Sequence, residues 1–396
     1  FLSKLMKPLA DIMVRKRESL IERFLSDDSF DFPEQFTQII DEYIVAVFET
    51  SMPAKRLIHS GYPFALIALG GFGRREQCIH SDIDLLILFE KDFPREVENF
   101  IQELLYPLWD ARFQVGYAVR NMDESLNLAF ERFDILTTVL DARLICGESM
   151  IYTSFLKNFR FMLFSGYMKR TLNYLYEYGE KRHSEFGDST QLISPDLKSG
   201  FGGLRDYHTL LWYAKIKSGI KTRRDLEYYG FLSHLEYVAL EQSLNDIWRI
   251  RNFLHHITKR RCDTLHFEYQ AELAGFPDYS HKKDHREVET FLGDLHNRMD
   301  FLKQIHHITF ENIFYNTQRR KRGNKPKPIR TYGLLIIKKR LYFKNTIVIL
   351  QKPDLLIKIF FESAKRKIPL SVSARRLISE FLHLVEDDLV KNRNTI

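Results

Sequence analysis

The sequence ALIALGGFGRREQCIHSDIDLLILFE, residues 65–90, is the pattern on which the other expectations for this chain depend. Its apolar start is typical of a buried strand, which the pair Gly70-Gly71 interrupts. A polar loop then leads into a second apolar strand that begins at Asp82. Because side chains alternate along a strand, Asp82 and Asp84 are predicted to lie on the same face. The stretch therefore predicts two strands and a pair of neighbouring carboxylates.

The chemistry of this stretch follows from the carboxylate pair and the glycines. Two carboxylates side by side repel each other, and a protein keeps such a pair mainly where a divalent cation offsets the repulsion. The glycines allow the backbone to approach a ligand closely and leave N–H groups available for phosphate oxygens. These parts suit metal-assisted transfer from a nucleoside triphosphate. The alternative is a hairpin with an Asp pair on its surface.

The spacing of the motif carries a family resemblance. An apolar residue, Gly-Gly, ten residues and Asp-x-Asp, here within residues 69–84, resembles the DNA polymerase beta-like nucleotidyltransferases. The fuller form GGFGRRE…HSDIDLL, residues 70–86, is similar to the PII-protein uridylyltransferases and their adenylyltransferase relatives. A second segment, PDLKSGFGGLRD at 195–206, resembles another motif of the PII uridylyltransferases. Arg75 and Asp196 depart from that family, which more often has Gly and Asn there.

Composition sets wide limits on the class of protein. The chain has 396 residues, is 44% hydrophobic and carries a net charge of +7, which permits a phosphate-bearing ligand without requiring nucleic acid. Its three cysteines, Cys78, Cys146 and Cys262, are too far apart for a zinc site or a disulfide framework, so a reducing cytoplasm is predicted. No run of eighteen apolar residues occurs, and no membrane span is expected.

The predicted fold class is α+β. A mixed-sheet nucleotidyltransferase core is expected inside a mostly helical chain that also contains a helical-bundle domain. Four parts are predicted: an N-terminal helical segment at 1–60, the catalytic domain at 61–150, a helical uridylyltransferase-associated domain at 151–320, and a linker, small hairpin and C-terminal helices at 321–396. The resemblance implies that full-length relatives continue into a phosphohydrolase domain and paired ACT domains. The chain is therefore expected to be either a fragment or a short relative that transfers without reversal.

The catalytic carboxylates are predicted to be Asp82, Asp84 and a third acid, with Asp82 and Asp84 binding the metal. The resemblance implies a third carboxylate on a neighbouring strand, but the strand predicted at 113–120 contains none. We nominate Asp141, in the segment LDARLICG. The alternative for Asp141 is a salt-bridged residue at a helix end, and Asp123 and Asp134 are weaker candidates.

The phosphate contacts are predicted on both motifs. Backbone N–H groups, a hydroxyl and a guanidinium of the first motif would contact the triphosphate, from Gly70, Gly71, Ser81 and Arg74. In the second motif, a glycine loop opens a helix, and Lys198 and Arg205 flank it with positive charge. The alternative is a tight interdomain turn in which Arg205 and Asp206 form ion pairs. Arg249 and Arg251 are interpreted as surface or capping residues, and the alternative is that such an arginine reaches into the site.

The resemblance implies transfer of UMP from UTP to a tyrosine of a PII-type signalling protein, with Mg²⁺ or Mn²⁺ as cofactor. Two alternatives remain open: a nucleotidyltransferase that acts on RNA or a small molecule, and a non-catalytic nucleotide-binding regulator. Nucleic acid is not expected as a partner, because the basic residues do not interleave with aromatic ones. The choice between UTP and ATP, the acceptor and the oligomeric state are left open.

Overall fold

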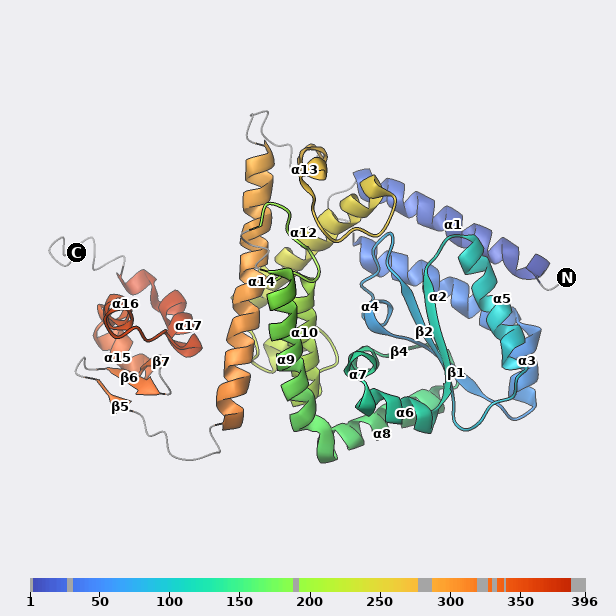
Figure 1. Cartoon of the computed structure of the whole chain (residues 1–396), viewed down its shortest axis with the longest axis horizontal. Helices are drawn as coiled ribbons and strands as arrows, with labels where there is room; N and C mark the ends of the chain where they lie inside the picture. The colour runs from blue at the N-terminus through green and yellow to red at the C-terminus, as the bar shows by residue number, and fades with distance from the viewer. Residues whose placement is uncertain are drawn as a thin grey trace. The chain divides into compact units, whose positions relative to one another are not determined.

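The structure is a computed structural model that describes residues 3–26, 31–187, 192–276, 287–318, 327–329, 333–337 and 340–385. It divides into two compact units, Phe1–His306 and His307–Ile396. The first unit contains the two sequence motifs, and its elements are labelled in Figure 1. Most of the linker predicted after residue 320 lies outside the described residues.

A four-stranded mixed sheet lies at the centre of the catalytic part (Figure 1). Its order is β3 (Val115–Asn121), β2 (Ile83–Phe89), β1 (Phe64–Ala68) and β4 (Arg143–Gly147). β1 pairs antiparallel with β2 and with β4, whereas β3 runs parallel to β2. All five residues of β1 are buried, as its apolar run predicted. The predicted α+β class with a mixed sheet is confirmed.

The glycine pair differs from its prediction, because it starts a helical turn and not a loop. Helix α4 (Gly70–Gly73) follows β1 directly, and the N–H groups of Gly73 and Arg74 donate to the carbonyls of Leu69 and Gly70 at 2.9 and 3.0 Å. The turn ends at Arg75, whose φ is +62°. Glycine is favoured in this left-handed conformation, which gives a physical reason why the resembled family more often has Gly at this position.

Helices pack on the sheet through aromatic side chains. The N-terminal helices α1 (Ser3–Ser26), α2 (Phe32–Thr50) and α3 (Met52–His59) share a core with α5 (Val97–Asp110). In that core the ring of Phe64 on β1 contacts those of Phe48, Phe89 and Phe100, with centroids 5.2 to 5.5 Å from Phe64. Three further helices complete this part: α6 (Met122–Glu131) contacts β3, α8 (Ser149–Met162) contacts β1 and β4, and α7 (Phe133–Leu140) contacts α6 and α4.

The remainder of the first unit is helical, as the sequence predicted. A short π-helix, η1 (Leu163–Tyr167), joins α8 to α9 (Met168–Phe186). The second motif forms the loop before α10 (Leu204–Ser218), where Gly202 has φ +91°. A Cβ at Gly202 would lie 2.5 Å from the carbonyl oxygen of Met299, so only glycine fits. The other helices are α11 (Asp225–Tyr228), α12 (His234–Thr258), α13 (Phe267–Ala274) and α14 (Glu287–Gln318).

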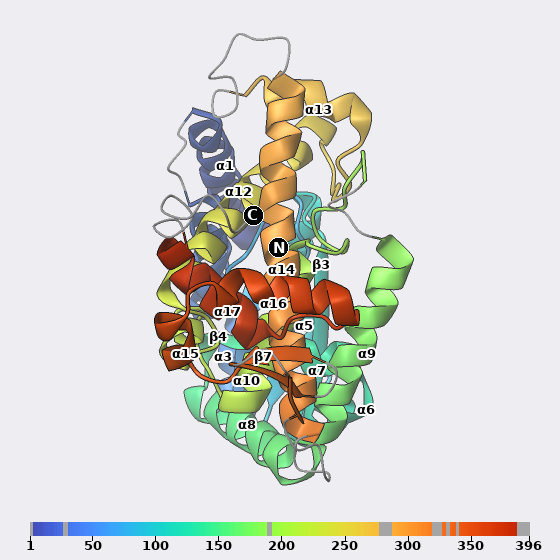
Figure 2. The same cartoon turned by 90° about the vertical axis from the view of Figure 1, so that its left-hand side faces the viewer.

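The second unit has its own apolar core. Its sheet consists of β5 (Lys327–Pro328), β6 (Leu334–Ile337) and β7 (Arg340–Phe343), and the antiparallel pairing of β6 with β7 confirms the predicted hairpin. The helices that follow this sheet are labelled in Figure 2: α15 (Thr346–Gln351), α16 (Leu355–Arg366) and α17 (Val372–Phe381). Within the described ranges of both units, no helix combines the length and hydropathy that a membrane crossing needs.

Candidate active site

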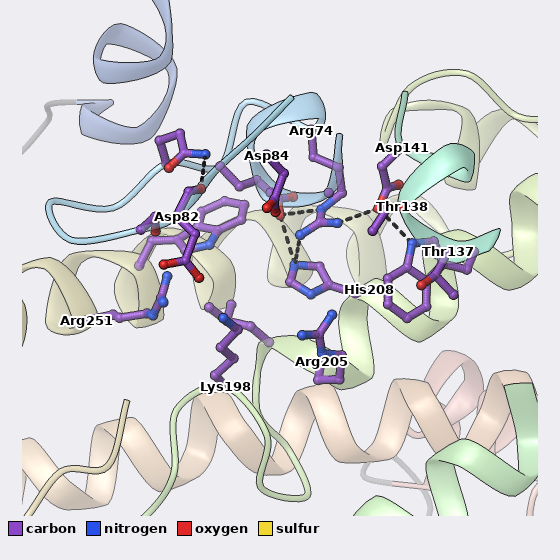
Figure 3. Close-up of a pocket in the computed structure, with 18 of the residues that line it drawn as sticks. Arg74, Asp82, Asp84, Thr137, Thr138, Asp141, Lys198, Arg205, His208 and Arg251 are labelled. Carbon is purple, nitrogen blue, oxygen red and sulfur yellow. Dashed lines mark hydrogen bonds and ion pairs between the residues drawn. The ribbon is translucent and has the colours of Figure 1, made fainter. Parts of the chain in front are cut away.

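A cavity of about 220 Å³ brings the two sequence motifs together (Figure 3). All nine residues predicted for the site line it. They come from α4 and its C-terminal end, the start of β2, the end of α7, the loop before α10 and the first turn of α10: Gly70, Gly71, Arg74, Ser81, Asp82, Asp84, Asp141, Lys198 and Arg205. Residues more than a hundred positions apart in sequence therefore face the same space.

The carboxylate pair lies at the edge of β2. Asp84 belongs to the strand, and Asp82 immediately precedes it. Burial, together with the negative charge of Asp82, raises the pKa of Asp84. Asp82 is more exposed and accepts a 2.6 Å contact from Arg261. The two carboxylates repel each other and offer oxygen ligands, so they fit a divalent cation. Arg261 would have to release Asp82 when a cation binds.

Strand β3 leaves no room for a third carboxylate beside Asp84. The register places Gly116 directly opposite Asp84. A Cβ on Gly116 would lie only 2.9 Å from Oδ1 of Asp84, so any side chain there would displace the carboxylate. Glycine at this position therefore preserves the position of Asp84.

We expect Gly116→Ala to lower transfer activity far more than stability. The new methyl group would push the Asp84 carboxylate aside, and a misplacement of about 1 Å can cost roughly 100-fold in rate. The measurement is kcat together with the thermal unfolding midpoint. Gly293→Ala is the matched control, because a Cβ at Gly293 meets nothing within 4 Å. Equal activities of the two variants would contradict the prediction.

Asp141, the predicted third carboxylate, lies at the C-terminal end of α7 and is buried. Its carboxylate accepts from Lys215 Nζ at 2.7 Å and Trp212 Nε1 at 2.8 Å, and it pairs with Arg74. Burial acts to raise the pKa of Asp141, but Lys215 and Arg74 outweigh it and the pKa is lowered. These contacts are those of a salt-bridged residue at a helix end, the alternative stated above, and a metal-binding role for Asp141 stays a prediction.

The two weaker candidates lie away from the cavity. Asp123 is exposed on α6, and Asp134 forms an ion pair with Arg132 in which both side chains are more than 60% exposed. Neither lines the cavity that contains Asp82 and Asp84.

Arg74 is held by a buried network that the sequence did not reveal. Its Nε contacts Glu76 at 2.7 Å, and Glu76 also accepts from the hydroxyl of Tyr207 at 3.0 Å. His208 lies 2.8 Å from Glu76, and burial and the nearby Arg74 lower the pKa of His208 to about 3. His208 is therefore neutral near pH 7. The only signal in the sequence was that Glu76 belongs to the first motif and that Tyr207 and His208 directly follow the second.

Basic side chains form the side of the cavity that faces Asp84 in Figure 3. Lys198 is mostly buried, and this burial and the charge of Arg251 lower the pKa of Lys198 to about 7. Arg205 packs over the ring of Trp212, 5.5 Å from its centroid. The interpretation of Arg251 as a surface or capping residue is wrong: its side chain is buried, lines the cavity and contacts Asp263 at 2.6 Å.

Of Arg205 and Asp206, the two residues that the alternative for the second motif placed in ion pairs, Asp206 forms one. Asp206 pairs with Arg182 and lies 2.8 Å from Nε2 of His183. Its other carboxylate oxygen accepts from the N–H of Gly202 at 2.7 Å. Asp206 therefore holds the glycine loop against α9. Together with His306 on α14, Asp206 and His183 bring potential metal-ligand atoms within 4.8 Å of one another, outside the lining of this cavity.

Ser81 and the glycine pair complete the predicted phosphate contacts. The hydroxyl of Ser81 accepts from the N–H of Cys78 at 3.0 Å, which leaves its own proton available to a ligand. Gly70 and Gly71 lie in the first turn of α4, and their backbone faces the cavity beside Asp84.

Comparisons with known proteins agree with this geometry. Residues 170–310 match the GlnD PII-uridylyltransferase family, and residues 31–120 match the nucleotidyltransferase DUF294 family. Three similar proteins are each called bifunctional uridylyltransferase/uridylyl-removing enzyme. The protein from Cereibacter sphaeroides is 29% identical over 83% of this chain, that from Ruegeria pomeroyi 26% over 96%, and that from Hydrogenovibrio crunogenus 31% over 81%. This chain spans 36%, 43% and 36% of their lengths.

Proposed function

Because the chain belongs to the PII-protein uridylyltransferase family, whose nucleotidyltransferase part it matches, we propose that it transfers UMP from UTP to a hydroxyl of a PII-type protein. Pyrophosphate is the other product. The observation that carries the proposal is one cavity with the Asp82–Asp84 pair on one side and Lys198 and Arg205 on the other. Carboxylates for cations and basic groups for phosphates are the two requirements of this reaction.

Asp82 and Asp84 would hold divalent ions, magnesium or manganese, which lower the pKa of the attacking hydroxyl and neutralise charge on the leaving pyrophosphate. Gly70, Gly71 and Ser81 would orient the triphosphate through N–H and hydroxyl donors. Positive charge around the phosphates would offset their charge in the transition state. That charge comes from three residues: Arg74, Lys198 and Arg205.

Arg74 can offset the charge of the phosphates only if its side chain is held in a fixed position. Two carboxylate partners hold it there. Glu76 contacts Nε of Arg74, and Asp141 contacts Nη1. We propose that Asp141 acts as a positioning residue for Arg74. A magnesium titration of transfer activity distinguishes this role from the predicted role of Asp141 as a third metal ligand. The fully buried Asp141 side chain supports the positioning role, because its carboxylate already accepts from three donors.

Transfer of label tests the proposed function directly. The chain is incubated with a purified PII-type protein, magnesium, and alpha-labelled UTP or ATP, and compared with Asp84→Asn. We expect label from UTP on the acceptor and none with the variant. Label from ATP would keep the mechanism and change the nucleotide. Label on RNA or a small molecule, or nucleotide binding without any transfer, would favour one of the two alternatives and contradict the proposal.

Triphosphate binding should weaken as the pH rises through about 7. The protonated form of Lys198 attracts phosphate, and its pKa of about 7 means that the ammonium of the free protein loses its proton across this range. The dissociation constant for UTP should therefore rise with pH in the wild type. Lys198→Arg is the matched control, since arginine stays charged and should flatten the profile. The same slope in both proteins would assign the titration to the nucleotide.

A further inference from the structure

We propose that a second cavity in the first unit binds a small organic anion with an apolar part, and that this ligand regulates the nucleotide site. The second cavity has a volume of about 1080 Å³ and adjoins the first. The two cavities share a wall of four lining residues: Arg74, Glu76, Asp141 and Trp248. The proposed transfer reaction assigns nothing to this space, and the inference does not depend on that reaction.

The charge of the second cavity favours an anion. Eight of its lining residues are Lys or Arg, and four are Asp or Glu. Three of the four acids are already paired: Glu76 and Asp141 with Arg74, and Glu34 with Arg75 at 2.5 Å. Among the described residues, three of the basic side chains have no carboxylate within ion-pairing distance: Lys157, Arg160 and Lys221, of which the first two are described next.

Lys157 and Arg160 lie at the exposed rim of the second cavity. They are three residues apart on α8 and therefore project from one side of the helix. Across the part of the chain that the structure describes, neither has a carboxylate within ion-pairing distance. An anion could therefore bind Lys157 and Arg160 at the rim without breaking an existing ion pair.

The floor of the second cavity is apolar, which limits the ligand to anions with a hydrophobic part. Side chains from α8, η1, α10, α12 and the residue after Gly219 form it: Leu156, Phe159, Leu163, Leu211, Ile220 and Trp248. Ligand pockets commonly occupy about 300–1,000 Å³ and combine such a surface with a few charged groups. A bare inorganic ion would leave most of this surface in contact with water.

The shared wall provides the coupling between the two cavities. Lys215 lines only the second cavity, where its ammonium contacts Asp141 at 2.7 Å and the carbonyl of Leu140 at 2.9 Å. An anion beside Lys215 would compete with Asp141 for that ammonium, and Asp141 also holds Arg74 in the nucleotide site. The wall separates this space from Asp82 and Asp84, so a ligand here acts as a regulator and not as the acceptor.

Binding of anilinonaphthalene sulfonate, a fluorescent apolar anion, tests the site with the full chain. We expect saturable binding to the wild type and a dissociation constant at least about tenfold higher in the double variant Lys157→Glu/Arg160→Glu, a change of 1.4 kcal/mol. The matched control is Lys169→Glu/Lys181→Glu, two exposed charge reversals on α9 that line neither cavity. Lys198→Ala checks that the probe does not occupy the nucleotide site.

Three results would overturn the proposal. The first is no binding by the wild type, the second is equal binding by both double variants, and the third is loss of binding in Lys198→Ala.

The coupling between the two cavities has its own test, since binding free energies are reciprocal. Saturation with the probe should change the affinity for UTP in the wild type but not in Lys157→Glu/Arg160→Glu. If UTP does not bind at all, the proposed function fails while the probe titration still decides whether the second site exists.

Discussion

Asp84→Asn should lower UMP transfer by at least about 10³-fold, the largest effect on activity that we expect from a single substitution. The neutral amide cannot replace a carboxylate as a ligand for the divalent ions that the reaction needs. The free energy of unfolding should rise or stay unchanged. Burial and the charge of Asp82 raise the pKa of Asp84, so the ionised carboxylate is disfavoured in the folded protein and the amide removes that repulsion.

The measurement is the rate of label transfer beside the thermal unfolding midpoint of each protein. Asp123→Asn is the matched control, because Asp123 is an exposed aspartate on α6 outside the cavity. Asp82→Asn should show the same loss of activity, and its ion pair with Arg261 is exposed enough to contribute little to stability. Near-normal turnover by Asp84→Asn would remove the carboxylate pair from the mechanism and favour a non-catalytic role.

The sequence predicted the parts of the site that local spacing determines. Asp82 and Asp84 line one cavity because side chains of a strand repeat every two residues, a rule that needs no tertiary information. The sequence also indicated Lys198 and Arg205, because the glycines between them disfavour a helix interior and end where α10 begins. The turn after β1 was assigned to a loop, since a four-residue helix has no hydrophobic periodicity to detect.

Pairings across long separations could not be predicted in this way. Glu76 meets His208 from 132 residues away, and both are buried polar side chains whose sequence neighbours do not indicate a partner. The apolar face of the helix that contains Arg251 suggested that the charge of Arg251 pointed to solvent. In the structure, Arg251 forms an ion pair with Asp263 in the interior. The register that places Gly116 against Asp84 depends on strand pairing, which one sequence leaves undetermined.

Asp141→Asn should lower the free energy of unfolding by about 3 kcal/mol, since removing one partner of a buried ion pair leaves the other charges uncompensated. Lys215 loses its carboxylate partner, and Arg74 keeps only Glu76. The pKa of Asp141 is lowered in the folded protein, mainly through Lys215 and Arg74 acting against burial. Its contribution to stability is therefore present above the unfolded pKa of about 3.9 and is lost as the pH falls through the folded value. Wild type and variant should approach each other in strong acid.

Denaturant unfolding at several pH values measures this effect, and Asp134→Asn is the matched control, an exposed aspartate on the same helix. A magnesium titration of transfer activity separates the two roles of Asp141. If Asp141 only positions Arg74, the variant should bind UTP more weakly while the magnesium concentration for half-maximal activity stays unchanged. A large increase in that magnesium concentration, with little loss of stability, would make Asp141 the third metal ligand and contradict the positioning role. To bind a metal ion, the carboxylate of Asp141 would have to release both Lys215 and Arg74.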